Sequence, residues 1–204
     1  MKIAIVTGAS SGMGREFVYA LDREGKYEEI WVIARRLDRL ESLKTECKTP
    51  IRPIALDLGK AESFDTYRAL LDAEKPDVSV LVNCAGFGKF GTYAEIPTEV
   101  ACEMIDLNCK ALVRSTEYTL PYMQAGAHIV ELDSLSSFQP VPYIGVYGAT
   151  KAFVLSYSRA LNVELRPRGI KVMAVCPGWV RTDFFDRAKT DCTDAVTYFN
   201  KMYE

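Results

Sequence analysis

Three residues between positions 134 and 151 have the types and spacing for acid–base chemistry. Tyr147 and Lys151 are four residues apart, so both side chains lie on one face if this segment is helical. A free tyrosine has a pKa of about 10, and an adjacent ammonium group is expected to lower that pKa toward neutrality. Ser134 ends an apolar run thirteen residues before Tyr147. The pattern predicts that Tyr147 donates or accepts a proton, with Lys151 and Ser134 beside it.

Simpler interpretations of these residues stay open. Tyrosine and lysine at this spacing also occur on ordinary helix surfaces, and Ser136 and Ser137 compete with Ser134 for the hydroxyl position. Asp133 adds a carboxylate that would raise the pKa of a nearby phenol unless it points away. A serine hydrolase is disfavoured because the chain has only one histidine, His128, which would have to serve as the catalytic base.

A glycine-rich turn near the N-terminus is suited to binding a dinucleotide. Residues 7–14 read TGASSGMG and follow an apolar run that predicts a strand. Glycines at a strand-to-helix turn let a pyrophosphate approach the backbone amides at the start of the helix. The alternative is a turn that needs glycine only for its conformation. The cofactor interpretation gives the candidate binding residues Gly8, Ser10, Ser11, Gly12, Met13 and Gly14.

The residues after the second and third predicted strands indicate which dinucleotide binds. The second strand ends in Arg35-Arg36, without the carboxylate that usually binds a free ribose hydroxyl. Two guanidinium groups suit the 2′-phosphate of NADP(H), so we expect NADP, with NAD less favoured. The alternative interpretation is that these two arginines lie at the solvent-exposed start of a helix and bind no cofactor. Asp57 ends the third strand and either binds the adenine amine or caps the next helix, and Leu58 is assigned to the same site.

An alternation of strands and helices must position these residues. Short runs rich in valine and isoleucine are typical of parallel strands that are covered on both faces. They occupy residues 3–7, 29–34, 51–56, 78–83, 128–133 and 170–176. Amphipathic stretches of helical period occupy residues 13–25, 37–47, 60–74, 98–124 and 146–166. The alternation predicts an α/β fold, a Rossmann-like doubly wound parallel sheet, as a single domain over residues 1–204.

Composition excludes several classes of function. Lys plus Arg total 25 and Asp plus Glu 27, a net charge of −2, so no nucleic-acid partner is expected. No apolar run approaches the roughly 20 residues of a membrane span, and no signal peptide is predicted. The six cysteines show no C-x2-C spacing and the chain has a single histidine. We therefore expect no metal, reduced thiols and a cytoplasmic location.

Together the motifs resemble those of the short-chain dehydrogenase/reductase family over essentially the whole chain. The order and approximate spacing of the family's motifs are matched by TGASSGMG (7–14), NCAG (83–86), Asn108, Ser134, YGATK (147–151) and PGWVRT (177–182). The resemblance implies the doubly wound fold and an NADP(H)-dependent interconversion of a carbonyl and an alcohol. It also implies that Asn108, Ser134, Tyr147 and Lys151 are catalytic.

Each catalytic residue has a separate role in the family pattern. Tyr147 exchanges a proton with the substrate oxygen, and Ser134 hydrogen-bonds the same oxygen. Lys151 binds the ribose next to the nicotinamide and lowers the pKa of Tyr147. Asn108 resembles the asparagine that interrupts a helix, anchors a water and completes a proton relay. The resemblance assigns further cofactor contacts to Asn83, Ala85, Gly86, Tyr147, Lys151, Pro177, Gly178, Val180 and Thr182, while Cys84 replaces a second asparagine.

The loops that would form the substrate wall are rich in apolar side chains. This composition favours an apolar or ring-bearing carbonyl or alcohol as the small-molecule substrate. The residues are Phe87, Phe90, Leu135, Phe138, Tyr143, Trp179, Phe184 and Phe185. They could instead pack against helices or another subunit. Relatives usually pair through the two long helices, so the resemblance implies a homodimer or homotetramer.

Two hypotheses of function remain, together with a question about the C-terminal part of the fold. The favoured function is an NADP(H)-dependent oxidoreductase, and the alternative is a non-catalytic NADP-binding sensor or scaffold protein. Only residues 183–204 follow the last family landmark, Thr182, whereas most relatives continue into a further helix and a seventh strand. The chain is therefore expected to lack the last strand of the fold, either as a reduced member of the family or because its C-terminal end has been lost.

Overall fold

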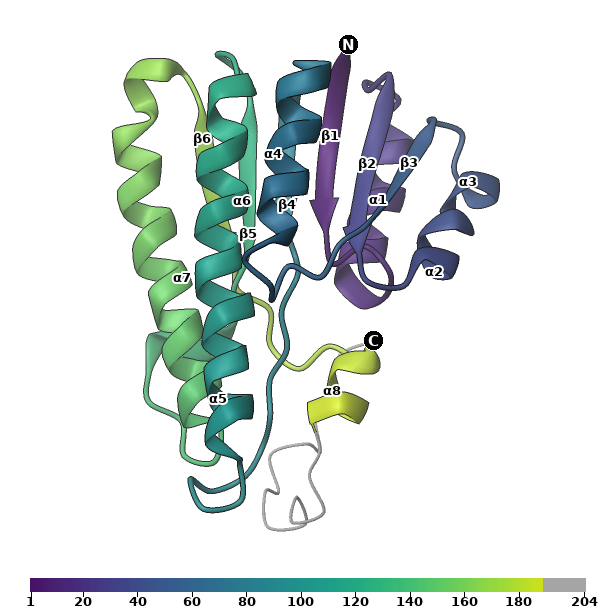
Figure 1. Cartoon of the computed structure of the whole chain (residues 1–204). Helices are drawn as coiled ribbons and strands as arrows, with labels where there is room; N and C mark the ends of the chain where they lie inside the picture. Colours follow the sequence, from purple (N-terminus) through teal and green to yellow (C-terminus); the bar gives the residue numbers. More distant parts are fainter. Residues whose placement is uncertain (189–204) are drawn as a thin grey trace.

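The chain forms one parallel β-sheet flanked by helices (Figure 1). The computed structural model describes residues 1–188. All strand pairs are parallel, and the sheet order is β3-β2-β1-β4-β5-β6. The strands are β1 (Lys2–Thr7), β2 (Glu29–Ala34), β3 (Ile51–Ala55), β4 (Asp77–Asn83), β5 (His128–Leu132) and β6 (Lys171–Val175). The order reverses between β1 and β4, which is the switch point where doubly wound sheets bind ligands.

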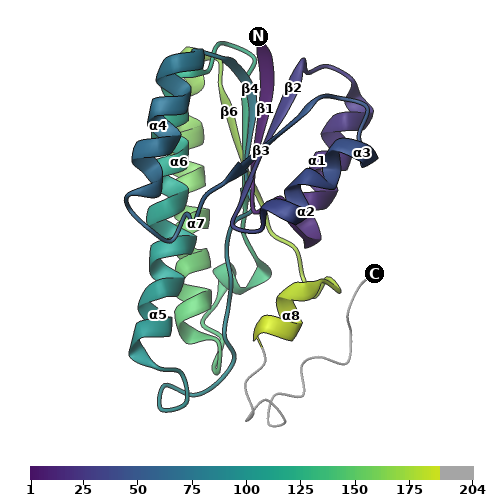
Figure 2. The same cartoon turned by 45° about the vertical axis from the view of Figure 1, so that its right-hand side comes forward.

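Helices cover both faces of this sheet. Figure 2 shows α4, α6 and α7 on one face and α1, α2 and α3 on the other, with α8 beyond the carboxyl ends of the strands. Their bounds are α1 (Gly12–Glu24), α2 (Leu37–Glu41), α3 (Leu43–Glu46), α4 (Ser63–Glu74), α5 (Thr98–Ile105), α6 (Leu112–Thr119), α7 (Gly145–Glu164) and α8 (Asp183–Ala188). A π-helical turn, η1 (Asp106–Ala111), joins α5 to α6, and short 3-10 turns occupy η2 (Leu120–Tyr122), η3 (Leu135–Phe138) and η4 (Arg166–Arg168). The fold is therefore the predicted Rossmann-like single domain.

The apolar strands bury both of their faces because successive side chains point to opposite sides. In β1, Ile3 and Ile5 pack into the cluster beneath α4, α6 and α7, while Ala4 and Val6 pack into the cluster beneath α1 and α2. All four are fully buried. This two-sided burial is the physical reason that the strand sequences are continuous in apolar residues.

The helix predicted over residues 98–124 is not one regular helix. The backbone follows α5 to Ile105, widens into the π-helical turn η1, and resumes as α6 at Leu112 before ending in η2. The helix predicted over residues 37–47 is likewise divided into α2 and α3. The widened turn contains Asn108, and π-helical turns are often found at functional sites.

Strand β6 forms one edge of the described sheet. It pairs with β5, and α7 covers the face that contains Val172. Met173 points to the opposite face and is 55% exposed. Within residues 1–188 no seventh strand pairs with β6.

Candidate active site

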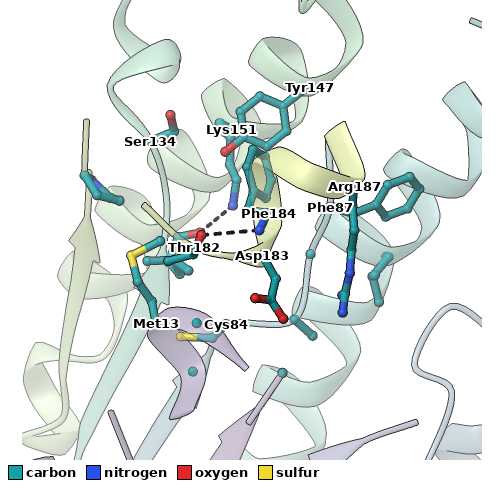
Figure 3. Close-up of a pocket in the computed structure, with 18 of the residues that line it drawn as sticks. Met13, Cys84, Phe87, Ser134, Tyr147, Lys151, Thr182, Asp183, Phe184 and Arg187 are labelled. Atoms are coloured by element: carbon teal, nitrogen blue, oxygen red, sulfur yellow. Dashed lines mark hydrogen bonds between the residues drawn. The ribbon is translucent and has the colours of Figure 1, made fainter. Parts of the chain in front are cut away.

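A cavity of about 570 Å³ lies at the carboxyl ends of the strands, at the switch point between β1 and β4. Figure 3 shows Ser134, Tyr147 and Lys151 at one end of it and Met13 and Cys84 toward the other. Every residue that the sequence assigns to catalysis or cofactor binding lines this cavity except Asn83 and Asn108. Segments from the whole length of the chain thus converge on one site.

The glycine-rich turn has the shape of a cradle. Gly8 and Gly12 adopt positive φ angles of 69° and 55°. A Cβ added to Gly8 would lie 2.7 Å from the backbone nitrogen of Ala85, and one added to Gly14 would lie 2.3 Å from the carbonyl oxygen of Gly8. Thr7 fixes this approach, because its Oγ1 accepts hydrogen bonds from the backbone nitrogens of Cys84 and Ala85 at 3.1 and 3.2 Å. The narrow turn at the start of α1 therefore fits a dinucleotide pyrophosphate.

Arg36 is positioned against this turn. Its Nη2 donates to Ser10 Oγ and to Ser11 Oγ, both at 3.0 Å, whereas the side chain of Arg35 is exposed. Burial lowers the pKa of Arg36, and the positive charges of Arg187 and Arg39 lower it further. A guanidinium group beside two hydroxyls is suited to bind a phosphate.

Asp57 does not cap the next helix. Its Oδ1 accepts a hydrogen bond from the backbone nitrogen of Gly59 at 3.2 Å, while α4 begins only at Ser63. Asp57 and Leu58 line the cavity, as the cofactor interpretation requires. The capping alternative is therefore wrong.

The groups suited to proton transfer lie close together and are largely buried. Lys151 is 6% exposed, and its Nζ donates to the carbonyl oxygen of Leu132 at 2.6 Å. The same Nζ lies 5.8 Å from the ring centroid of Tyr147. The Ser134 hydroxyl acts on the Tyr147 phenol and opposes the rise in its pKa, and Ser134 Oγ accepts from the backbone nitrogen of Ser136 at 3.2 Å. Because Ser134 is the serine that influences the phenol, the structure favours Ser134 over Ser136 as the site hydroxyl.

The pKa of Tyr147 moves in the direction opposite to the one expected from its lysine neighbour. Burial raises this pKa to about 12, the hydrogen bond from Ser134 opposes the rise, and the charge of Asp133 adds to it. Lys151 directs its ammonium group at the Leu132 carbonyl rather than at the phenol oxygen. Tyr147 therefore keeps its proton at neutral pH in this environment.

Asp133 is a second titratable group at the same place. It is only 2% exposed, and its Oδ2 accepts a hydrogen bond from Cys176 Sγ at 3.3 Å. Within the described chain its Oδ1 has no hydrogen-bond partner. Burial raises the pKa of Asp133. Burial also lowers the pKa of Lys151, although the negative charge of Asp133 acts to raise the pKa of that lysine.

Asn108 holds the loop that follows β4. Its Oδ1 accepts from the backbone nitrogen of Phe87 at 3.0 Å, and its Nδ2 donates to the carbonyl oxygen of Phe87 at 2.9 Å and to Thr150 Oγ1 at 3.1 Å. A Cβ added to Gly86 would lie 2.9 Å from Asn108 Oδ1. The π-helical turn thus aims a buried amide at the loop beside Tyr147 and at the helix that carries it.

Asn83 belongs to a polar network beneath the cavity. Its Nδ2 donates to Thr116 Oγ1 at 2.9 Å and to Glu131 Oε1 at 3.3 Å, and its Oδ1 accepts from Ser115 Oγ at 2.7 Å. Glu131 is fully buried, and burial raises its pKa to about 7. The sequence analysis overlooked Glu131. The available signal was a carboxylate within a strand that is apolar on both sides.

An aromatic cluster closes the end of the cavity near Tyr147. The ring of Phe184, from α8, lies 5.4 Å from that of Tyr147, and the ring of Phe185 stacks on Phe90 at 6.3 Å. The predicted wall residues Phe87, Phe90, Leu135, Trp179, Phe184 and Phe185 line the cavity. The prediction was wrong for Phe138 and Tyr143, which are 61% and 44% exposed and do not line the cavity. Helix α8 also brings Asp183 and Arg187 to the cavity, which the sequence analysis had not assigned.

Comparison with known proteins identifies the family. The sequence matches the short chain dehydrogenase family over residues 2–193. The chain belongs to this family. It is therefore an oxidoreductase of the short-chain dehydrogenase type, with the dinucleotide-binding fold described above.

Three similar proteins illustrate the relationship. An uncharacterized oxidoreductase of Staphylococcus epidermidis is 34% identical over 209 residues, spanning 97% of this chain and 90% of that protein. A short-chain dehydrogenase from Sphingobium yanoikuyae in complex with NADPH has a TM-score of 0.84 at 31% identity, covering 95% of this chain and 77% of that one. The bulky-bulky ketone specific alcohol dehydrogenase from Comamonas testosteroni has a TM-score of 0.79 at 31% identity, covering 89% and 74%.

Two properties of the described residues bear on other classes of protein and site. None of the helices in residues 1–188 combines the length and the apolar character needed to cross a membrane. Within the same residues, no group of three or more His, Cys, Asp or Glu side chains is arranged to hold a metal ion.

Proposed function

We propose that this protein is an NADP(H)-dependent reductase that converts a carbonyl to an alcohol. The observation that carries the proposal is the composition of the cavity. Ser134, Tyr147 and Lys151 lie at one end, and Arg35 and Arg36 line the cofactor-binding region. One cavity thus combines a proton donor with groups that suit a 2′-phosphate.

When bound, the nicotinamide cofactor supplies the hydride. The chain supplies the proton and positions the reactants. Tyr147 is protonated at neutral pH because burial raises its pKa to about 12, so it can donate its phenolic proton to the carbonyl oxygen. Ser134 donates a hydrogen bond to that same oxygen and polarises it. The buried ammonium group of Lys151 binds the ribose hydroxyls next to the nicotinamide.

The remaining cofactor contacts are those that the family resemblance assigns to residues lining the cavity. The glycine-rich turn from Gly8 to Gly14 holds the pyrophosphate, and Asp57 and Leu58 flank the adenine. Ala85 and Gly86 form the wall beside the nicotinamide ribose, while Pro177, Gly178, Val180 and Thr182 position the carboxamide. Asn83 and Asn108 support this wall from outside the cavity through the hydrogen bonds described above.

The proposed substrate is a bulky apolar ketone or the corresponding alcohol. Phe90, Trp179, Phe184 and Phe185 form an apolar surface around Tyr147, and such surfaces recognise apolar ligands. The similarity to an alcohol dehydrogenase whose name specifies bulky-bulky ketones supports this class.

The quaternary structure and location are also part of the proposal. We place the protein in the cytoplasm, which the five free cysteines among the described residues support. We propose a homodimer or homotetramer that pairs through α5 and α7. Exposed apolar side chains on these two helices support this pairing, and they include Ile105, Phe153 and Val163.

The proposed function is tested by turnover with both nicotinamide cofactors. Purified protein is mixed with NADPH or NADH and a panel of bulky apolar ketones and polyol-derived ketoses, and loss of absorbance of the reduced cofactor is followed. We expect turnover with NADPH on the apolar ketones. Turnover restricted to the ketoses would contradict the substrate class. Tight NADPH binding without any turnover would favour the alternative of a sensor or scaffold protein.

A further inference from the structure

Arginines from two distant parts of the chain meet near the phosphate-binding region of the cavity. Arg36 follows β2, Arg39 lies in α2, and Arg187 lies in the last turn of α8. Arg36 and Arg187 line the same cavity. Figure 3 shows the side chains of Asp183 and Arg187 extending from α8 in the same direction, away from Tyr147. The cofactor contacts assigned so far do not include any residue of α8.

The charges in this region are not balanced. The carboxylate of Asp183 pairs with Arg39 at 3.2 Å. Among the carboxylates whose side chains the structure describes, none lies at ion-pair distance from the guanidinium group of Arg36 or of Arg187. Two like charges that face one cavity repel each other unless an anion lies between them. An anion is therefore the ligand that this arrangement favours.

The backbone of α8 is held in place on its other side. The backbone nitrogen of Phe90 donates to the carbonyl oxygen of Ala188 at 2.9 Å, and Lys89 Nζ donates to that of Arg187 at 2.5 Å. These contacts fix the main chain of Arg187, while its side chain is exposed and has no hydrogen bond or ion pair within the described residues. A fixed backbone with an available guanidinium group is a suitable arrangement for binding a phosphate.

We propose that Arg187 is a further cofactor-binding residue, which binds a phosphate group of the dinucleotide from the side opposite Arg36. The proposal rests on the proposed NADP(H) function. The phosphate would link α8 to the end of β2, next to the exposed Arg39–Asp183 ion pair, which contributes little to stability by itself. Because Phe184 and Phe185 lie on the same helix, cofactor binding would also fix part of the substrate wall.

The test is cofactor affinity of the Arg187→Gln variant, measured by isothermal titration calorimetry with NADPH and with NADH. Losing one charge-assisted contact is expected to raise the Kd for NADPH roughly 10-fold. Arg187→Lys, which keeps the charge but not the bidentate geometry, should lose less. Arg23→Gln is the matched control, because Arg23 is exposed at the far end of α1. Its Kd should equal that of the wild type.

The two cofactors separate the possible phosphates and the possible failures. A larger loss with NADPH than with NADH assigns Arg187 to the 2′-phosphate, and equal losses assign it to the pyrophosphate; both support the inference. An unchanged Kd for both cofactors in Arg187→Gln overturns it. A wild-type protein that binds neither cofactor overturns the proposed function itself, and that result does not depend on any variant.

Discussion

The two ends of the cavity differ in how their functional groups are held. Near Tyr147, Lys151 is buried, and Asn108, which supports the adjoining loop, is buried as well. Their hydrogen bonds to backbone carbonyl groups or to neighbouring side chains fix each of them in one position. At the end of the cavity that contains the glycine-rich turn, Arg35 and Arg187 are exposed, and Arg36 reaches that turn through two serine hydroxyls.

Under the proposed function, the two ends therefore contribute to catalysis in different ways. Buried groups near the reacting atoms act through geometry and pKa, so one substitution should mainly reduce kcat. Several exposed arginines are proposed to bind the phosphate groups of the cofactor together, so replacing one of them should mainly raise the Kd for the cofactor. Variants at each end can be ordered by the effect this comparison predicts.

The largest effect in this series is expected for Lys151→Met. Removing the buried ammonium group eliminates the cation beside Tyr147 and the proposed ribose contact, so kcat should fall by at least about 100-fold. Thermal stability should be nearly unchanged, because the buried charge already carries a desolvation cost. Steady-state kinetics and thermal melting check the two expectations. Lys110→Met, at an exposed lysine of η1, is the control; comparable kcat values for the two variants would remove Lys151 from the mechanism.

A smaller effect, limited to binding, is expected for Arg36→Gln. The loss of one charge-assisted contact to phosphate should raise the Kd for NADPH roughly 10- to 100-fold, with little change for NADH. Equilibrium titration with both cofactors measures this ratio. Equal changes for NADPH and NADH would show that Arg36 does not bind the 2′-phosphate.

The smallest effect on catalysis and cofactor binding is expected for Glu131→Gln, whose consequence is a change in stability. The pKa of Glu131 is raised from 4.5 to about 7 by burial, so its neutral form is favoured in the folded protein. The associated stability is present below pH 4.5 and is lost as the pH rises to about 7. The variant should therefore gain stability over the wild type with increasing pH, by at most about 3–4 kcal/mol.

Thermal melting at pH 5 and pH 8 measures that gain. We expect the Tm difference between Glu131→Gln and the wild type to be several degrees more positive at pH 8. Glu99→Gln, at an exposed position of α5, serves as the control. A Tm difference that does not vary with pH would mean that Glu131 is already ionised in the folded protein at pH 5.

The strands could be predicted closely from the sequence because a single physical property determines them. Residues buried on both faces of a parallel sheet must be apolar, and β2 accordingly occupies the predicted residues 29–34. The residues assigned to catalysis were also found together, because the carboxyl ends of parallel strands meet at one edge. Asn108 was identified by family resemblance. The periodicity of a regular helix does not predict its position, because Asn108 lies in a π-helical turn.

Features that depend on distant contacts could not be predicted. The pKa of Tyr147 depends on burial by α8 and on the orientation of Lys151, and neither follows from the four-residue spacing. Phe138 and Tyr143 were assigned to the substrate wall from composition alone, whereas the path of the chain leaves both exposed. Arg187 reaches the cavity only because α8 turns back over it, and no local motif marks such a turn.

The central claim is that Tyr147 donates the proton while other residues bind the cofactor. The most direct test compares Tyr147→Phe with the wild type in two measurements, the Kd for NADPH and the rate of single-turnover hydride transfer to a bulky ketone. The account predicts a Kd within about twofold of the wild type and a rate reduced by about 100- to 10,000-fold. An unchanged transfer rate in Tyr147→Phe would contradict it.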